Sequence, residues 1–174
     1  GGYGLAAQWL DDFHHAVHVM LTGEQQGYYI DFAGHADLDK CLNDYFICDG
    51  RYSTYRKRRH GRPATALPPE RFIVSTQTHD QVGNRGNGER LCHLTSLHNC
   101  QIAAALMLLS PFVPMLFQGE EWAASTPFLY FTDHVDKGLA KAVREGRKRD
   151  YAFLGGKVPD PQAATTFRRS ILKW

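Results

Sequence analysis

Short apolar runs that stop at polar clusters recur along this chain. The runs typical of strands, rich in β-branched and aromatic residues, are 5–10, 71–77 and 112–117. The stretches that predict helices are 12–21, 37–47, 90–110 and 136–150. Because strands and helices alternate, the pattern favours an α/β fold with a parallel sheet and helices outside it.

Local signals refine these boundaries. Asp12 is the expected N-cap of the first helix, and Gly23 is expected to stop it. Residues 102–109 are apolar all round, which predicts a largely buried helix portion closed by Pro111. Residues 49–70 are rich in Arg, Gly and Pro and are expected to form a long loop.

Polar groups follow the apolar runs at two places. His79 and Asp80 come after the run at 71–77 and lead into a turn that contains Gly83, Gly86 and Gly88. Gly119-Glu120-Glu121-Trp122 follows the run at 112–117. Carboxylate and imidazole groups at the end of a strand suit the upper rim of a barrel enzyme.

The segment from Arg71 to Arg85 resembles the His-Asp strand of the α-amylase family of glycoside hydrolases. Three further blocks agree with that family in order, and with the first they cover nearly the whole chain: 7–18, 114–122 and 125–134. The resemblance implies a (β/α)8 TIM barrel, which needs about 250 residues. The 174 residues are therefore expected to form an internal, incomplete portion (1–174) of one barrel domain, roughly strands six to eight with their helices.

The resemblance also implies a division of chemistry. Glycosidic cleavage needs two carboxyl groups flanking the bond. The family's nucleophilic aspartate and acid/base glutamate would fall before Gly1, so the isolated chain is expected to be inactive. Asp80 would stabilise the transition state and His79 would donate to the same sugar, although a buried His-Asp pair could instead only brace a turn. Thr78 and Ala6 depart from the family pattern, which usually has Asn and an acidic residue there.

Other polar and aromatic residues are expected to bind substrate: Trp9, Asp11, Asp12, Gln81, Arg85 and Glu120. Three alternatives stay open beside this role. Asp11, Asp12 and the nearby histidines could cap or brace the helix, and His14 and His18 have a one-turn spacing that can ligate metal, a weak signal. Glu120 or Glu121 could pair with Arg85 or Arg90 instead of contacting an outlying sugar.

The resemblance implies hydrolysis of an α-glucan, with maltooligosyl-trehalose cut at the α-1,4 bond next to its trehalose end. Residues 81–85 favour this reading. The alternatives are an α-1,4-glucan branching enzyme, which transfers a chain rather than giving it to water, and a non-catalytic carbohydrate-binding relative.

Composition adds exclusions. With 43% apolar residues and no apolar run of 18 or more, no membrane span is expected. A net charge of +2 gives no reason to expect a nucleic-acid partner, and the basic run 56–62 predicts a solvated loop or lid. Neither a metal nor a cofactor is expected. The wide spacing of Cys41, Cys48, Cys92 and Cys100 predicts free thiols, which points to the cytoplasm.

Overall fold

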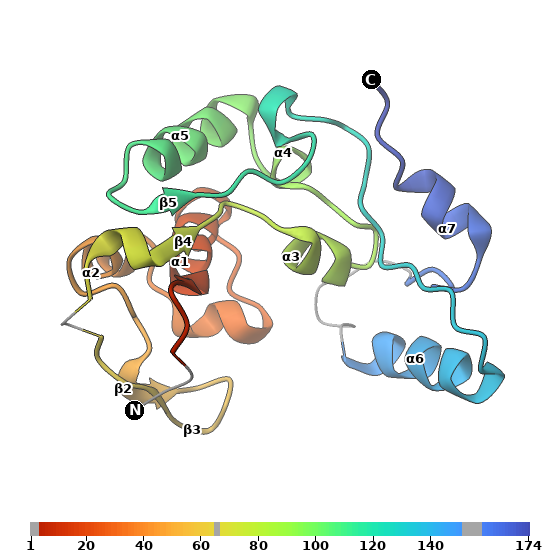
Figure 1. Ribbon diagram of the computed structural model, residues 1–174, viewed down its shortest axis with the longest axis horizontal. Helices are drawn as coiled ribbons and strands as arrows, with labels where there is room; N and C mark the ends of the chain where they lie inside the picture. Colours follow the sequence, from red (N-terminus) through yellow and green to blue (C-terminus); the bar gives the residue numbers. More distant parts are fainter. Residues whose placement is uncertain (1–3, 65–66, 151–157) are drawn as a thin grey trace. The chain divides into compact units, whose positions relative to one another are not determined.

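The computed structural model describes residues 4–64, 67–150 and 158–174 (Figure 1). The chain divides into two compact units. The first consists of Gly1–Thr76 and Leu97–Leu116, and the second of Gln77–Ser96 and Phe117–Trp174.

The first unit contains a parallel sheet in the order β1-β4-β5, formed by β1 (Gln8–Trp9), β4 (Phe72–Val74) and β5 (Val113–Pro114). In the register, Gln8 lies opposite Phe72, and Ile73 lies opposite Val113. The predicted parallel α/β arrangement is confirmed. The strands are shorter than the apolar runs that predicted them, because only part of each run makes ladder hydrogen bonds.

Helices surround this sheet: α1 (Asp11–Thr22), η1 (Gly27–Asp31), α2 (His35–Asp44), η2 (Pro69–Arg71) and α5 (Leu97–Leu108). The predicted helices at 12–21 and 37–47 are confirmed. Gly23 ends α1 in the left-handed region (φ 71°), where its N–H donates to the Val19 carbonyl. The expected N-cap at Asp12 is wrong, since Leu10 holds that position.

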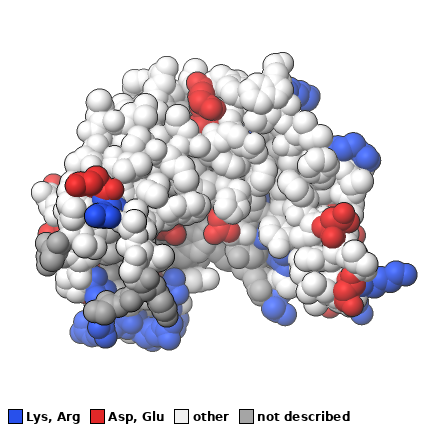
Figure 2. Space-filling model, in the orientation of Figure 1, with Lys and Arg blue, Asp and Glu red and all other residues white. Residues whose placement is uncertain are grey.

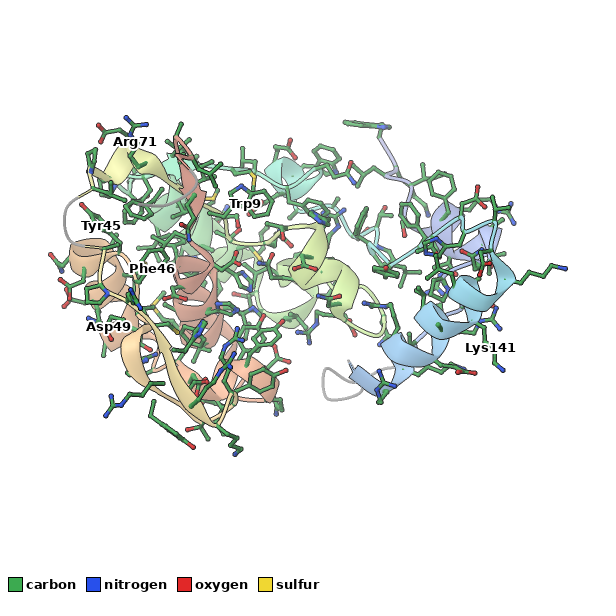
Figure 3. All side chains as sticks on the ribbon, turned by 60° about the horizontal axis from the view of Figure 1, so that its bottom comes forward. Trp9, Tyr45, Phe46, Asp49, Arg71 and Lys141 are labelled. Carbon is green, nitrogen blue, oxygen red and sulfur yellow. The ribbon has the colours of Figure 1, made fainter. Side chains whose placement is uncertain are left out.

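Aromatic rings fill the core of the first unit. Phe13 of α1 and Phe72 of β4 both pack edge-on against Phe112, at ring-centroid distances of 6.3 and 6.4 Å. Tyr45 stacks on Phe72 at 4.5 Å and Phe46 meets it at 5.7 Å (Figure 3). Full burial of such a side chain contributes about 1.5–3 kcal/mol to the free energy of folding. The cluster therefore stabilises the packing of α1 against the sheet.

The long loop that composition predicted at residues 49–70 is wrong for residues 49–61. These residues form an antiparallel hairpin of β2 (Asp49–Ser53) and β3 (Arg58–Gly61). The strands escaped prediction because their side chains are mostly polar. At the foot, Gly61 has φ +80°, and a Cβ there would lie 1.5 Å from the Cys48 carbonyl oxygen, so only glycine fits.

Aspartates of neighbouring helices hold the hairpin in place. The Asp31 carboxylate accepts hydrogen bonds from Ser53 Oγ (2.5 Å) and from the Thr54 N–H (2.6 Å). Asp37 is 5% exposed, and its carboxylate forms an ion pair with Arg51 at 2.9 Å. The prediction of a solvated basic loop at 56–62 is confirmed in its exposure for Arg56 to Arg59, but it is wrong as a loop from Arg58 to Gly61, which form β3. Figure 2 shows Lys and Arg side chains gathered over the region of the hairpin.

The second unit consists of short helices joined by extended segments: α3 (His79–Asn84), α4 (Leu91–Leu94), η3 (Glu120–Trp122), α6 (Lys137–Asp150) and α7 (Ala164–Arg169). The charged helix predicted at 136–150 is confirmed as α6, whereas α7 was not predicted. Arg90 is 1% exposed and donates to the Thr126 and Gln118 carbonyls at 2.6 and 2.8 Å. Burial lowers the pKa of Arg90 from its usual value.

The helix predicted at 90–110 is two helices, α4 and α5, because the backbone becomes extended at Thr95 (φ −149°, ψ 178°). The expectation that its apolar portion is largely buried is also wrong. Only Ala103 and Met107 of α5 are buried, and Leu109 is 85% exposed. The hydropathy of a segment indicates that burial of its side chains would be favourable. It does not indicate which residues pack against them. Within the described residues, no helix is long and apolar enough to span a membrane.

Candidate active site

His79 and Asp80 begin the helix α3 rather than ending a strand. β4 stops at Val74, and buried residues 75–78 carry the chain onward. Thr78 is the N-cap of α3, because its Oγ1 accepts a hydrogen bond from the Asp80 N–H at 3.2 Å. The same hydroxyl donates to Gln81 Oε1. The threonine that departs from the family pattern therefore fixes the first turn of α3.

The Asp80 carboxylate is exposed and partly oriented. Its Oδ1 accepts a hydrogen bond from Asn84 Nδ2 at 3.0 Å, one helical turn away. In the part of the chain that the structure describes, no group donates to Oδ2 of Asp80. His79 is exposed as well. The alternative of a buried His-Asp pair is therefore wrong, and the carboxylate can accept hydrogen bonds from a hydroxyl-rich ligand.

Other predicted residues of the second unit serve its framework. The Arg85 side chain is 8% exposed, with Nε 3.5 Å from Glu89 Oε2. Glu120 Oε2 accepts from the Phe117 N–H at 2.9 Å and so stabilises the turn before η3. A pairing of Glu120 or Glu121 with Arg85 or Arg90 stays a prediction, as does sugar contact by Gln81, Arg85 and Glu120.

Trp9, Asp11 and Asp12 lie in the first unit, at the carboxyl end of β1. Trp9 is 44% exposed, so part of its indole ring is accessible to solvent (Figure 3). Asp12 is half-buried, and its Oδ2 accepts hydrogen bonds from the Ile47 and Cys48 N–H groups at 2.7 and 2.9 Å. Burial raises the pKa of Asp12 above its usual value, although these two hydrogen bonds oppose the shift. Asp12 is thus an anchor for the hairpin foot, and substrate contact by these three residues stays a prediction.

The histidines of α1 take part in internal hydrogen bonds. His14 has Nδ1 2.6 Å from the Thr76 carbonyl and Nε2 3.0 Å from the Tyr29 hydroxyl. His18 Nε2 lies 2.6 Å from Glu24 Oε2. These contacts engage both ring nitrogens of His14 and Nε2 of His18, and the described residues contain no group of three or more side chains that could hold a metal ion. The structure favours the bracing role of this cluster.

The four cysteines are free thiols, as predicted. Cys41 is fully buried, and burial raises its pKa far above the usual range. Burial also raises the pKa of Cys48, to about 11. Raised values disfavour the thiolate, so neither residue has the character of a nucleophile.

The sequence analysis did not predict that Asn84 contacts Asp80 or that Arg147 contacts Asn84. The spacing of Asn84, four residues after Asp80, is the signal that could have revealed its hydrogen bond. Arg147 donates to Asn84 Oδ1 at 2.7 Å and to the Gly83 carbonyl at 2.6 Å. No sequence pattern distinguishes it from the other cations of α6, since its partners lie more than sixty positions away.

The comparison with solved structures shows which class of protein this chain is similar to. The chain superposes with a TM-score of 0.88 on the crystal structure of a Salmonella typhimurium protein assigned as an alpha amylase. The two are 45% identical, and the match covers 98% of this chain and 30% of that one. No family model matches the sequence. The predicted resemblance to the α-amylase family of glycoside hydrolases is confirmed.

Curated relatives narrow the resemblance to malto-oligosyltrehalose trehalohydrolase. The chain is 50% identical over 173 residues to that enzyme of Saccharolobus solfataricus and 51% identical over 178 residues to that of Brevibacterium helvolum. It is 46% identical over 179 residues to the Mycobacterium tuberculosis relative. These matches cover 99–100% of the chain, which spans only about 30% of the length of the relatives.

Proposed function

We propose that the chain forms part of the catalytic barrel of a glycoside hydrolase that releases trehalose from maltooligosyl-trehalose. The bond cleaved is the α-1,4 bond next to the trehalose end. The observation that carries the proposal is the exposed Asp80 carboxylate, held by Asn84 at the start of α3, in a chain about 50% identical to named trehalohydrolases. The parallel order β1-β4-β5 is consistent with strands six, seven and eight of a (β/α)8 barrel.

Asp80 assists cleavage without attacking the sugar. In this class one carboxylic acid protonates the leaving glycosidic oxygen and a carboxylate attacks the anomeric carbon, and water then hydrolyses the glycosyl-enzyme. The resemblance assigns both groups to strands outside this chain. Asp80 would accept hydrogen bonds from hydroxyls of the distorted ring and stabilise the positive charge that develops on it. His79 would donate to the same sugar.

The remaining predicted residues would extend the substrate site. Trp9 offers a stacking face for a sugar ring, and Asp11, Asp12, Gln81, Arg85 and Glu120 offer hydrogen-bonding groups. The free thiols suit the cytoplasm as the place of action. No observation on the described residues specifically favours the branching enzyme or the non-catalytic binder.

A segment exchange tests the proposal. The matching 173 residues of the Saccharolobus solfataricus relative are replaced by this chain, and release of trehalose from maltooligosyl-trehalose is measured. The exchanged enzyme is expected to be active, and the chain alone is expected to be inactive. Transfer of glucan instead of hydrolysis would support the branching enzyme, and binding without cleavage would support the binder.

Asp80→Asn in the exchanged enzyme tests the assignment of the residue. The substitution keeps size but removes the charge, so kcat is expected to fall at least ~10²-fold, about 3 kcal/mol of transition-state stabilisation. Glu145→Gln is the matched control, since its side chain on α6 is 63% exposed and lies 3.9 Å from Lys141. Near-normal turnover of Asp80→Asn would refute the role of this carboxylate.

A further inference from the structure

We propose that Arg147 is a positioning residue for the Asp80 carboxylate and acts through the Asn84 side chain. The inference rests on the proposed catalytic role of Asp80. Arg147 lies on α6, far along the chain from α3, and it has no part in the family resemblance on which the site was predicted.

Two hydrogen bonds in series connect the three side chains. Arg147 Nη1 donates to Asn84 Oδ1 at 2.7 Å, and Asn84 Nδ2 donates to Asp80 Oδ1 at 3.0 Å. All three residues belong to the second unit. A guanidinium can therefore influence the carboxylate through one intervening amide.

The chemistry of the amide makes this connection directional. Asparagine has an acceptor on one side of its amide and donors on the other, whereas arginine can only donate. The contact with Arg147 fixes Oδ1 toward the guanidinium, which leaves Nδ2 facing Asp80. Without the guanidinium, the amide could turn and present its oxygen to the carboxylate, and that contact would be repulsive.

Arg147 itself is held rigidly enough for this role. The residue is 6% exposed, and its Nη2 donates to the Gly83 carbonyl at 2.6 Å. Its guanidinium carbon lies 4.1 Å from the centre of the Tyr130 ring, within the range of a cation–π interaction. The planar fork thus binds two consecutive residues at the end of α3.

α3 needs such support because it has only six residues. Isolated helices of this length are not stable in water, so the geometry of Asp80 and Asn84 depends on tertiary contacts. Arg147 supplies two of them at the end of α3, and the Thr78 cap fixes the other end.

The test uses the exchanged enzyme with Arg147→Gln, Arg147→Lys, Asn84→Leu and the double variant Arg147→Gln/Asn84→Leu. Each glutamine or leucine variant is expected to lower kcat about 10-fold, with KM changed less than about 2-fold, because supporting contacts of this kind are commonly worth 10-fold or more in activity. The double variant is expected to be no slower than the slower single variant. Arg147→Lys, which keeps the charge but not the fork, is expected to lie between wild type and Arg147→Gln.

Arg144→Gln is the matched control. Arg144 lies on the same helix and carries the same charge, but it pairs with Asp160 at 3.0 Å. Its kcat is expected to be unchanged. If Arg147→Gln fails to fold, Arg147→Lys decides, since it removes the fork but leaves the Asn84 side chain in place, and a kcat equal to that of wild type would then overturn the proposal.

The outcomes separate this inference from the proposed function. Additive losses in the double variant, or losses confined to KM or melting temperature, would overturn the positioning role. If Asp80→Asn abolishes turnover while Arg147→Gln and Asn84→Leu keep it, this inference alone fails. If Asp80→Asn keeps normal turnover, the proposed role of Asp80 fails first and this inference fails with it.

Discussion

Replacing Asp12 by alanine is expected to release the foot of the β2–β3 hairpin. The substitution leaves the N–H groups of Ile47 and Cys48 without the carboxylate that accepts from both, and Ile47 is 0% exposed. An unsatisfied buried donor costs about 1–3 kcal/mol, so the local loss is expected to be about 2–4 kcal/mol. Asp12→Asn keeps an acceptor at the same place and is expected to cost about 1 kcal/mol.

Hydrogen exchange measured by mass spectrometry on a peptide containing residues 46–49 reports this change directly. In the exchanged enzyme, Asp12→Ala is expected to lower amide protection at least about 30-fold and Asp12→Asn about 5-fold, since 1.4 kcal/mol corresponds to tenfold. Asp39→Ala is the control, because Asp39 is exposed on α2 and its carboxylate accepts a hydrogen bond from Asn43 on the same helix, at 3.4 Å. Equal protection in the alanine and asparagine variants would show that the acceptor at position 12 does not hold the foot.

The pH dependence of Asp12 has a defined sign. Burial raises the folded-state pKa above the usual 3.8, so the folded state gives up its proton less readily than the unfolded state. The free energy of unfolding therefore decreases as pH rises from 3.8 through the folded-state pKa. Asparagine does not titrate, so the advantage of wild type over Asp12→Asn in free energy of unfolding is expected to be larger near pH 4 than at pH 8. A gap that widens with pH would refute the reasoning.

Three further predictions concern stability and reactivity. Gly88→Ala is expected to lower the free energy of unfolding by about 1–3 kcal/mol in thermal melts, because residue 88 has φ +65° and a Cβ there would lie 2.6 Å from the Phe128 carbonyl oxygen. Gly4→Ala, with φ +68° and open space around the added Cβ, is expected to lower it less. Burial lowers the pKa of His15 to about 3, so the free energy of unfolding is expected to decrease as pH falls below 6.5. His15→Phe is expected to reduce the difference in melting temperature between pH 8 and pH 5. With its pKa near 11, the Cys48 thiol is expected to react with iodoacetamide at pH 8 much more slowly in the native than in the denatured protein, and equal rates would contradict this expectation.

The parallel sheet and the helices α1, α2 and α6 could be predicted because their signals are local. Phe72 to Val74 is a short β-branched and aromatic run, and the positive φ of Gly23 ends α1 where the pattern required a stop. The hairpin could not be predicted in this way, because its polar strands are stabilised by Asp31 and Asp37 from other elements. Hydropathy reports none of these contacts.

The sequence predicted that the candidate residues His79 and Asp80 follow the strand β4, but it did not predict the contacts that support them. His79 and Asp80 are exposed as an active-site pair requires, and the hydrogen bond from Asn84 follows helical spacing. The hydrogen bond from Arg147 joins segments 63 positions apart, and nothing in the sequence marks Arg147 among the cations of α6. Asp12 failed as a cap for a similar reason, since its partners at Ile47 and Cys48 are remote.

The attachment of the hairpin by remote carboxylates has a consequence for folding kinetics. A two-stranded hairpin alone is at most marginally stable in water, so β2 and β3 are expected to order only after η1 and α2 have placed Asp31 and Asp37. These contacts would then form late and act mainly on the rate of unfolding. The tip beyond Tyr55 does not take part in them, so its length and sequence are expected to vary without slowing folding.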